Sequence, residues 1–169
     1  MTRRYHNHEV LLATTESDKK KCMDVRYQVF IVEQKYPAYI EVNEPIDPIA
    51  DHFLLIANTV DNDNSQGGRG GDGEKVPVGT VRMHINDEEG VAILSRLAVL
   101  SDARGCSYGK ILVQAVIECA KARGVQALTL SAQHFKVDFY KHLGFHIDND
   151  EVFYRYDVAH YHMRMPLEP

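Results

Sequence analysis

Cysteine is scarce in this sequence, and long hydrophobic runs are missing. Its three cysteines, Cys22, Cys106 and Cys119, form an odd and widely spaced set, which argues against a disulfide framework and favours a reducing compartment. We therefore expect a cytoplasmic protein, with the nucleus as the alternative. No stretch approaches the length of a membrane span, and the first nine residues are too polar for a signal peptide. These absences predict a soluble protein.

Positive charge is also in deficit. The net charge of the 169 residues is -5 at pH 7, and no basic stripe offers the electrostatic footprint that nucleic acid or an anionic membrane requires. Hydrophobic residues make up 44% of the chain, which is enough to fill one core. We expect a single domain over residues 1–169 that binds neither nucleic acid nor membrane.

Clusters of metal ligands are sparse as well. His160 and His162 alternate along one predicted strand, and His6 and His8 lie near the start of the chain. No cysteine or second cluster at ligand spacing accompanies them, so we expect no metal site.

The first part of the chain predicts a strand, a helix and an irregular loop. A short apolar run over 10–13 precedes Thr15, which with Asp18 forms a helix cap. The helix has an apolar face at Cys22, Val25, Val29 and Val32. Residues 36–51 contain three prolines among acidic residues, which predicts a shaped loop and a candidate wall for a substrate.

The rest of the pattern predicts a mixed α/β sandwich. Residues 61–75 are rich in Gly, Asn, Asp and Ser, which predicts a flexible insertion. Strands are predicted over 52–58, 76–85, 91–99 and 127–130, helices over 109–122 and 135–143, and two further strands within 145–165. Residues 87–90 supply a hairpin turn. In this order of elements, helices cover a central sheet.

The most informative segment joins the strand ending at Val99 to the helix that follows it. Its loop, Arg104–Lys110, contains two glycines and leads directly into the helix. Free backbone N–H groups and the positive end of the helix dipole converge at such a point and bind anions, for which a pyrophosphate is a natural ligand. A purely structural turn is the alternative on spacing alone, and the loop lacks the Lys-Ser/Thr ending of a P-loop.

Several motifs resemble, in order and spacing, the acyl-CoA signature of the GCN5-related N-acetyltransferase (GNAT) superfamily. They are Arg96-Leu97-Ala98-Val99, then Arg104-Gly105-x-x-x-Gly109 before a helix, then Phe139-Tyr140-x-x-x-Gly144-Phe145. The resemblance implies an α/β fold with a mixed, mostly antiparallel central sheet flanked by helices. One position departs from the pattern: Ser107 stands where the family has the middle glycine, and its Cβ limits how closely the backbone approaches a phosphate.

A second set of residues resembles the ElaA-like branch of that superfamily. The first block is Arg26-x-x-Val29-Phe30-x-Val32-Glu33-Gln34, and the further matches are Tyr39, Glu41, Asp47, Ala50, His52, Ala132, Gln133, His134, Phe153, Asp157, His160 and Met163. Together with the GNAT motifs they cover most of residues 26–165.

The GNAT resemblance implies acetyl-CoA as co-substrate. The backbone of Leu97, Ala98 and Val99 would pair with pantetheine, and the Val99 N–H would polarise the thioester carbonyl. The pyrophosphate would lie on Arg104, Gly105, Cys106, Ser107, Tyr108, Gly109 and Lys110. Phe139 and Tyr140 would line the same site, with the Tyr140 hydroxyl donating to the coenzyme sulfur. A packed aromatic is the alternative for Tyr140.

Three residues are candidates for the general base: Glu33, His52 and His160. Each lies in a block that resembles the ElaA-like pattern, and the sequence does not choose between them. Histidine titrates near the working pH and can accept the proton of an ammonium. A half-buried His52 bonded to backbone, and a satisfied polar pair at Glu33-Gln34, are the structural alternatives. Four loop acids either attract a cationic amine or form solvated surface: Glu41, Glu44, Asp47 and Asp51.

The sequence thus predicts an N-acetyltransferase that moves an acetyl group from acetyl-CoA to a primary amine by direct attack. The acceptor is a small amine or a peptide amine. A protein lysine or N-terminal acetyltransferase is one alternative, and a non-catalytic acyl-CoA sensor, suggested by Ser107, is another. A homodimer is the alternative to a monomer.

Overall fold

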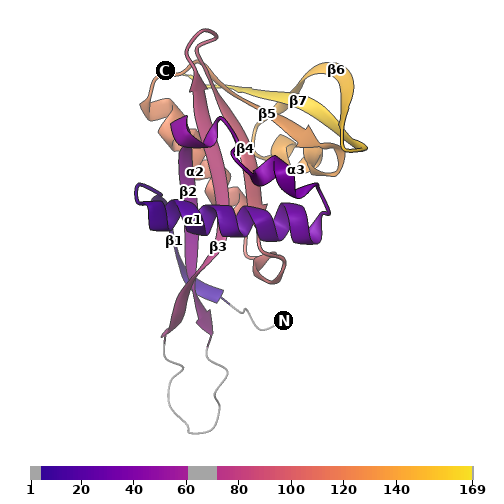
Figure 1. Cartoon of the computed structure of the whole chain (residues 1–169). Helices are drawn as coiled ribbons and strands as arrows, with labels where there is room; N and C mark the ends of the chain where they lie inside the picture. Colours follow the sequence, from indigo (N-terminus) through magenta and orange to yellow (C-terminus); the bar gives the residue numbers. More distant parts are fainter. Residues whose placement is uncertain (1–4, 61–71, 169) are drawn as a thin grey trace, which may run out of the picture.

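A seven-stranded sheet forms the centre of the computed structural model, which describes residues 5–60 and 72–168 (Figure 1). In sheet order the strands are β1 (Tyr5–Leu12), β2 (Asp51–Val60), β3 (Asp72–Asn86), β4 (Val91–Val99), β5 (Ala127–Gln133), β7 (Val158–Pro166) and β6 (His146–Arg155). Neighbouring strands are antiparallel except β4 and β5, which are parallel. The mixed, mostly antiparallel sheet predicted from the sequence is confirmed.

Helices cover both faces of this sheet. The α-helices are α1 (Glu16–Arg26), α2 (Tyr108–Ala122) and α3 (Val137–His142), and the short π- or 3-10 segments are η1 (Tyr27–Glu33), η2 (Ala38–Glu41), η3 (Asp47–Ile49), η4 (Ser101–Ala103) and η5 (His134–Lys136). Successive side chains of a strand point to opposite faces. Leu54 of β2 packs with Cys22 of α1, whereas Leu55 packs in the core with Leu112 of α2. Figure 1 accordingly shows α1 in front of the sheet and α2 behind it.

Thr15 caps α1, as the sequence predicts. Its Oγ1 accepts a hydrogen bond from the Asp18 N–H at 3.1 Å. The Thr15→Ala variant lacks this acceptor, so we expect its free energy of unfolding to fall by about 1 kcal/mol. Denaturant unfolding measures the change, and Thr15→Ser, which keeps the hydroxyl, is the matched control. Equal stability of the two variants would contradict a capping role.

The predicted apolar face of the first helix is correct up to Val29 and wrong at Val32. Cys22, Val25 and Val29 are buried, but Val32 is 43% exposed. The chain changes from an α-helix to a π-helix in η1, where the Gln34 N–H donates to the Val29 carbonyl, five residues back, at 2.9 Å. The wider turn rotates the later side chains about the axis, so a face extrapolated from α-helical spacing does not reach Val32.

Two stretches that the sequence predicts to be irregular contain regular structure. The predicted insertion at 61–75 falls partly on 61–71, outside the described residues, and 72–75 belong to β3. The loop predicted over 36–51 contains two single-turn segments, η2 and η3, in keeping with its three prolines.

The parallel strands β4 and β5 separate soon after they meet. Within the described residues their register covers only Val91–Ile93 against Ala127–Thr129. Farther along β4, Arg96 has a φ of 55°, and the register against β3 shifts between Ser95 and Ala98. These are the marks of a β-bulge, which bends the strand that contains it. Past this point β4 no longer follows β5, and the sheet opens between them.

Candidate functional site

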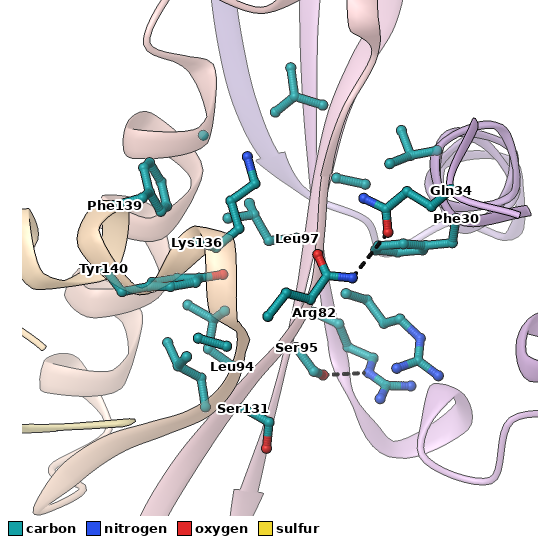
Figure 2. A pocket seen from close by; sticks show the side chains of 18 of the residues that line it. Phe30, Gln34, Arg82, Leu94, Ser95, Leu97, Ser131, Lys136, Phe139 and Tyr140 are labelled. Carbon is teal, nitrogen blue, oxygen red and sulfur yellow. Dashed lines mark hydrogen bonds between the residues drawn. The ribbon is translucent and has the colours of Figure 1, made fainter. Parts of the chain in front are cut away.

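A cavity of about 1120 Å³ lies where β4 and β5 diverge. It is lined by η1 and the loop after it, by β3 and β4, and by loop 104–110, β5, η5 and α3. The turn between β6 and β7 and the imidazole of His160 also line it. Figure 2 shows Tyr140 on one side of this space and Gln34 and Arg82 on the other. Residues from both halves of the chain therefore meet at one site.

The loop Arg104–Lys110 brings a helix N-terminus to the cavity. Ser107 is the N-cap of α2 and has a φ of 62°, in the left-handed region that favours glycine. The first N–H groups of a helix have no acceptor within the helix, and with the side chain of Lys110 they make this wall positive. Every predicted residue of the loop lines the cavity except Cys106, which packs against the hydrophobic core.

The end of β4 presents backbone groups to the opening. Leu97, Ala98 and Val99 all line the cavity. The Leu100 N–H donates to the Val78 carbonyl of β3 at 2.9 Å. Because successive amides of a strand point to alternate sides, the Val99 N–H faces away from β3, towards the side where β5 has diverged.

Glu33, one of the three candidate bases, lines the cavity but is held in an ion pair. Its two carboxylate oxygens accept hydrogen bonds from the Arg104 guanidinium at 2.5 and 2.9 Å. Arg104 Nε also donates to the Val99 carbonyl at 3.1 Å. Both oxygens of Glu33 are thus engaged, and the pair ties η1 to the start of the phosphate loop.

Tyr140 lies on α3 with its hydroxyl directed towards the cavity (Figure 2). Its ring packs edge-on between Phe139 and Phe145, with ring centroids 5.0 and 5.7 Å away. The residue is only 8% exposed, and burial raises the pKa of Tyr140 well above its usual range. The phenol therefore stays protonated at neutral pH, and its hydroxyl can donate a hydrogen bond.

His160 also lines the cavity and is buried, 6% exposed and stacked on Phe153 at 5.5 Å. Its Nδ1 lies 2.8 Å from the Val158 carbonyl oxygen. Since a carbonyl can only accept, Nδ1 carries the proton and Nε2 keeps a lone pair. Burial lowers the pKa of His160, so the imidazole is neutral at pH 7 and able to accept a proton.

His52 is not brought to the cavity. The side chain is 1% exposed, and its Nε2 donates to the Asp47 carbonyl at 2.9 Å. It is absent from the residues that line the cavity within the described chain. The structure thus corrects the candidacy of His52 as a base, because a buried imidazole bonded to backbone has no path to an acceptor amine. It matches the structural alternative instead.

Three of the four predicted loop acids form a largely buried ion network with three arginines. The acids are Glu41, Glu44 and Asp47, and the arginines are Arg26, Arg82 and Arg96. Arg26 is fully buried and binds Glu41 at 2.5 Å and Asp47 at 2.8 Å. Asp51, the fourth predicted acid, pairs with Arg123 at 2.7 Å. Each acid is already paired with an arginine, so neither alternative describes them well: they are not free to attract a cationic amine, and Glu41, Glu44 and Asp47 are not solvated surface. The loop does line the cavity, through Tyr36, Ile40 and Glu41.

Sequence reasoning missed His84, which lines the cavity from β3 beside Arg82. Its Nδ1 is buried and has no hydrogen-bond partner among residues 5–60 and 72–168. Burial, aided by the positive charge of Arg82, lowers the pKa of His84. The signal was the strict alternation of polar Thr80, Arg82 and His84 with apolar Val81 and Met83, which places the polar residues on one face of a strand.

A hydrogen-bonded bridge spans the cavity wall between β5 and the segment after η1. Gln133 Nε2 donates to the Gln34 Oε1 at 3.2 Å and to the Tyr36 hydroxyl at 2.7 Å. The tip of the β6–β7 hairpin adds Tyr156, whose ring packs edge-on to Tyr36 at 5.6 Å. These contacts enclose the end of the cavity that lies away from α2.

Other kinds of site are not evident in the part of the chain that the structure describes. There, no three His, Cys, Asp or Glu side chains are grouped to hold a metal ion. No helix of this part combines the length and the apolar character needed to cross a membrane.

Comparison with known proteins yields consistent similarities. The sequence pattern of the acetyltransferase (GNAT) family matches residues 32–145. The uncharacterized N-acetyltransferase YjcF of Bacillus subtilis (strain 168) is 29% identical over 155 residues, which cover 92% of this chain and 97% of YjcF. An acyl-CoA N-acyltransferase from Pseudomonas aeruginosa has a TM-score of 0.71 at 25% identity, covering 94% of this chain and 98% of its own. Escherichia coli ElaA shares the fold with a TM-score of 0.71 at 22% identity and the same coverage.

Proposed function

The chain belongs to the acetyltransferase (GNAT) family and is an N-acyltransferase, and from that premise we propose that it moves an acetyl group from acetyl-CoA to a primary amine by direct attack. The observation that carries the proposal is that one cavity joins the N-terminus of α2, the open edge of β4, the Tyr140 hydroxyl and His160. An anion site, an extended edge, a proton donor and a proton acceptor are what such a transfer requires.

The cavity wall around α2 fits the coenzyme. The N–H groups that open α2, with the side chain of Lys110, suit a pyrophosphate. Gly105 has a φ of 82°, and a Cβ built there would meet nothing within 4 Å, so open space lies over this turn. The unpaired side of Leu97 to Val99 suits the pantetheine arm, because an extended amide chain can pair with a free strand edge.

The chemistry divides between two residues of this chain. Acetyl-CoA supplies a thioester: the amine nitrogen bonds to its acyl carbon, the carbon–sulfur bond breaks, the nitrogen loses a proton and the sulfur gains one. His160 Nε2 accepts the proton from the amine, directly or through water. Tyr140 supplies the proton to the sulfur, and the Val99 N–H polarises the acyl carbonyl. Glu33 has a positioning role through Arg104.

Thiol release with acetyl-CoA and a panel of small amines and peptides tests this function. We expect turnover with at least one small primary amine and coenzyme binding by calorimetry. Binding without turnover on any acceptor would favour the acyl-CoA sensor. Turnover only on peptides would favour a protein lysine or N-terminal acetyltransferase. Sedimentation of the same preparation tests whether the chain is a monomer or a homodimer.

Ser107→Gly tests the phosphate loop. Ser107 holds a left-handed backbone conformation, and its Cβ stands where the family has none. Removing the Cβ lets a phosphate approach the backbone more closely, so we expect coenzyme affinity to rise about fivefold, equivalent to about 1 kcal/mol. Titration calorimetry with coenzyme A measures the change.

Ser107→Ala is the matched control, because it removes the hydroxyl but keeps the Cβ. We expect no gain in affinity in this variant. Equal affinities of the Gly, Ala and parent proteins would show that the serine already accommodates the phosphate.

A further inference from the structure

The cavity lining has the opposite charge to the chain as a whole. The chain carries a net charge of -5, but the ionisable side chains that line the cavity, histidine and tyrosine aside, are six cations and two carboxylates: Arg82, Arg96, Arg104, Lys110, Lys136, Arg155, Glu33 and Glu41. A cavity lined mainly by charges of one sign attracts ligands of the opposite charge. The site therefore selects for anionic ligands at more than one place.

The positive charge lies at two ends. Arg104, Lys110 and Lys136 lie near α2 and α3, and Figure 2 shows Lys136 beside Phe139 and Tyr140. Arg104 is paired with Glu33, so Lys110 and Lys136 are the cations of this end that match the phosphates of the proposed coenzyme. The cations of the other end are Arg82, Arg96 and Arg155, around the segment after η1, the β-bulge and the β6–β7 turn. The coenzyme phosphates do not account for this second group.

Two arginines of the second group already have carboxylate partners. Arg82 binds Glu44, and it binds Asp47 at 2.7 Å. Arg96 Nε lies 2.7 Å from Glu41, and Arg96 Nη2 donates to the Ile40 carbonyl at 3.3 Å. With the buried Arg26 they form a network of three cations and three anions, which is balanced in charge. Arg82 and Arg96 thus stabilise the wall of the cavity, and their positive charges are fully balanced by carboxylates.

Arg155 is the cation of this end whose positive charge is not balanced by a carboxylate among the described residues. No carboxylate lies within ion-pair distance of it among residues 5–60 and 72–168, and its guanidinium packs over the Phe153 ring at 5.3 Å. Phe153 also stacks on His160, the base proposed above. The Arg155 side chain is therefore supported on an aromatic ring, next to the place where an acceptor amine gives up its proton. A planar guanidinium with free N–H groups is suited to bind a carboxylate through two hydrogen bonds.

A simple ammonium ion is poorly suited to this end of the cavity, since it would meet a surplus positive charge. An acceptor with its own anionic group would neutralise that charge and be oriented by it. We propose that the acceptor is an amine that also carries an anionic group, of the amino-acid class, and that Arg155 binds this group. The inference rests on the proposed function and names its substrate class.

Matched acceptor pairs test the proposal with the full chain and acetyl-CoA. The pairs are α-amino acids and ω-amino acids of increasing length, each with its own carboxamide, and phosphoethanolamine with ethanolamine. We expect the anionic member of at least one pair to have a kcat/KM about tenfold or more above that of its neutral partner. A preference in the phosphate pair alone would assign the anion as a phosphate in place of a carboxylate, and equal kcat/KM within every pair would overturn the proposal.

Variants of Arg155 assign the preference to this residue. Arg155→Gln should remove most of the preference by raising the KM for the anionic acceptor about tenfold, with the KM for acetyl-CoA unchanged. Arg155→Lys should restore part of it. Lys121→Gln removes one exposed positive charge from α2, away from the cavity, and should have no effect. A preference that survives Arg155→Gln would overturn the role of Arg155, whereas no transfer to any amine, charged or neutral, would refute the proposed function itself.

Discussion

Tyr140→Phe is expected to lower kcat by about 100-fold or more, while the affinity for acetyl-CoA changes by less than about twofold. The hydroxyl is the polar atom that this buried ring directs towards the cavity, and burial keeps it protonated by raising the pKa of Tyr140. Phenylalanine keeps the packing against Phe139 and Phe145, so the substitution removes the proton donor and leaves the wall intact. Thiol release at saturating substrates gives kcat, and calorimetry gives the affinity.

Tyr154→Phe is the control for this experiment. Tyr154 is 71% exposed on β6 and does not line the cavity, so its hydroxyl can be removed with no expected effect on kcat. If Tyr140→Phe turned over as fast as the parent, Tyr140 would have no part in the transfer. If affinity and kcat fell together, the residue would act in binding and packing.

The strands and helices around the cavity were predictable because their signals are local. The strand predicted over 91–99 is β4, Val91–Val99, and the helix predicted over 109–122 is α2, Tyr108–Ala122. Each segment is bounded by turn residues, and its apolar spacing extends over its whole length. The resemblance to the GNAT pattern, not a local signal, marked Ser107 as standing at a glycine position, and its φ of 62° lies in the left-handed region that favours glycine.

The ion network was not predictable from the sequence, because its partners are distant along the chain. Arg26 and Asp47 are 21 residues apart, and Arg82 and Asp47 are 35 apart. A run of acidic residues in a proline-rich loop looks the same in sequence whether it is solvated or buried against arginines. Only the fold decides which of the two occurs, and it also decides that His52 turns its imidazole to the carbonyl of Asp47.

The network explains how an irregular loop can form a defined wall of the cavity. The segment over 36–51 has little regular hydrogen bonding of its own, and charged groups buried without partners would be strongly unfavourable. Arg26 and Arg82, 0% and 4% exposed, fix the loop through Glu41, Glu44 and Asp47. The same pairs balance the charge of these carboxylates, so they add no net negative charge to the end of the cavity where Arg155 is proposed to bind an anionic acceptor.

His160→Gln is expected to lower kcat by about 100-fold and to change its dependence on pH. A base must be neutral to accept a proton, so kcat of the parent should fall as the pH drops through the pKa of His160. Burial lowers that pKa, which places the acidic limb below the ordinary histidine value of about 6.5. Above this limb kcat should be level through pH 7. Glutamine cannot accept the proton, so the limb should disappear together with most of the rate.

Two controls separate a base from a structural histidine. His146→Gln alters an exposed histidine at the start of β6 and should leave kcat and its pH profile as in the parent. His84→Gln alters the other cavity imidazole with a lowered pKa and should retain the acidic limb. If the limb vanished in His84→Gln and persisted in His160→Gln, the proton would pass to His84. If His160→Gln lost activity with no change in the shape of the profile, His160 would support the site through its contacts with Val158 and Phe153, because loss of packing does not remove a titration from kcat.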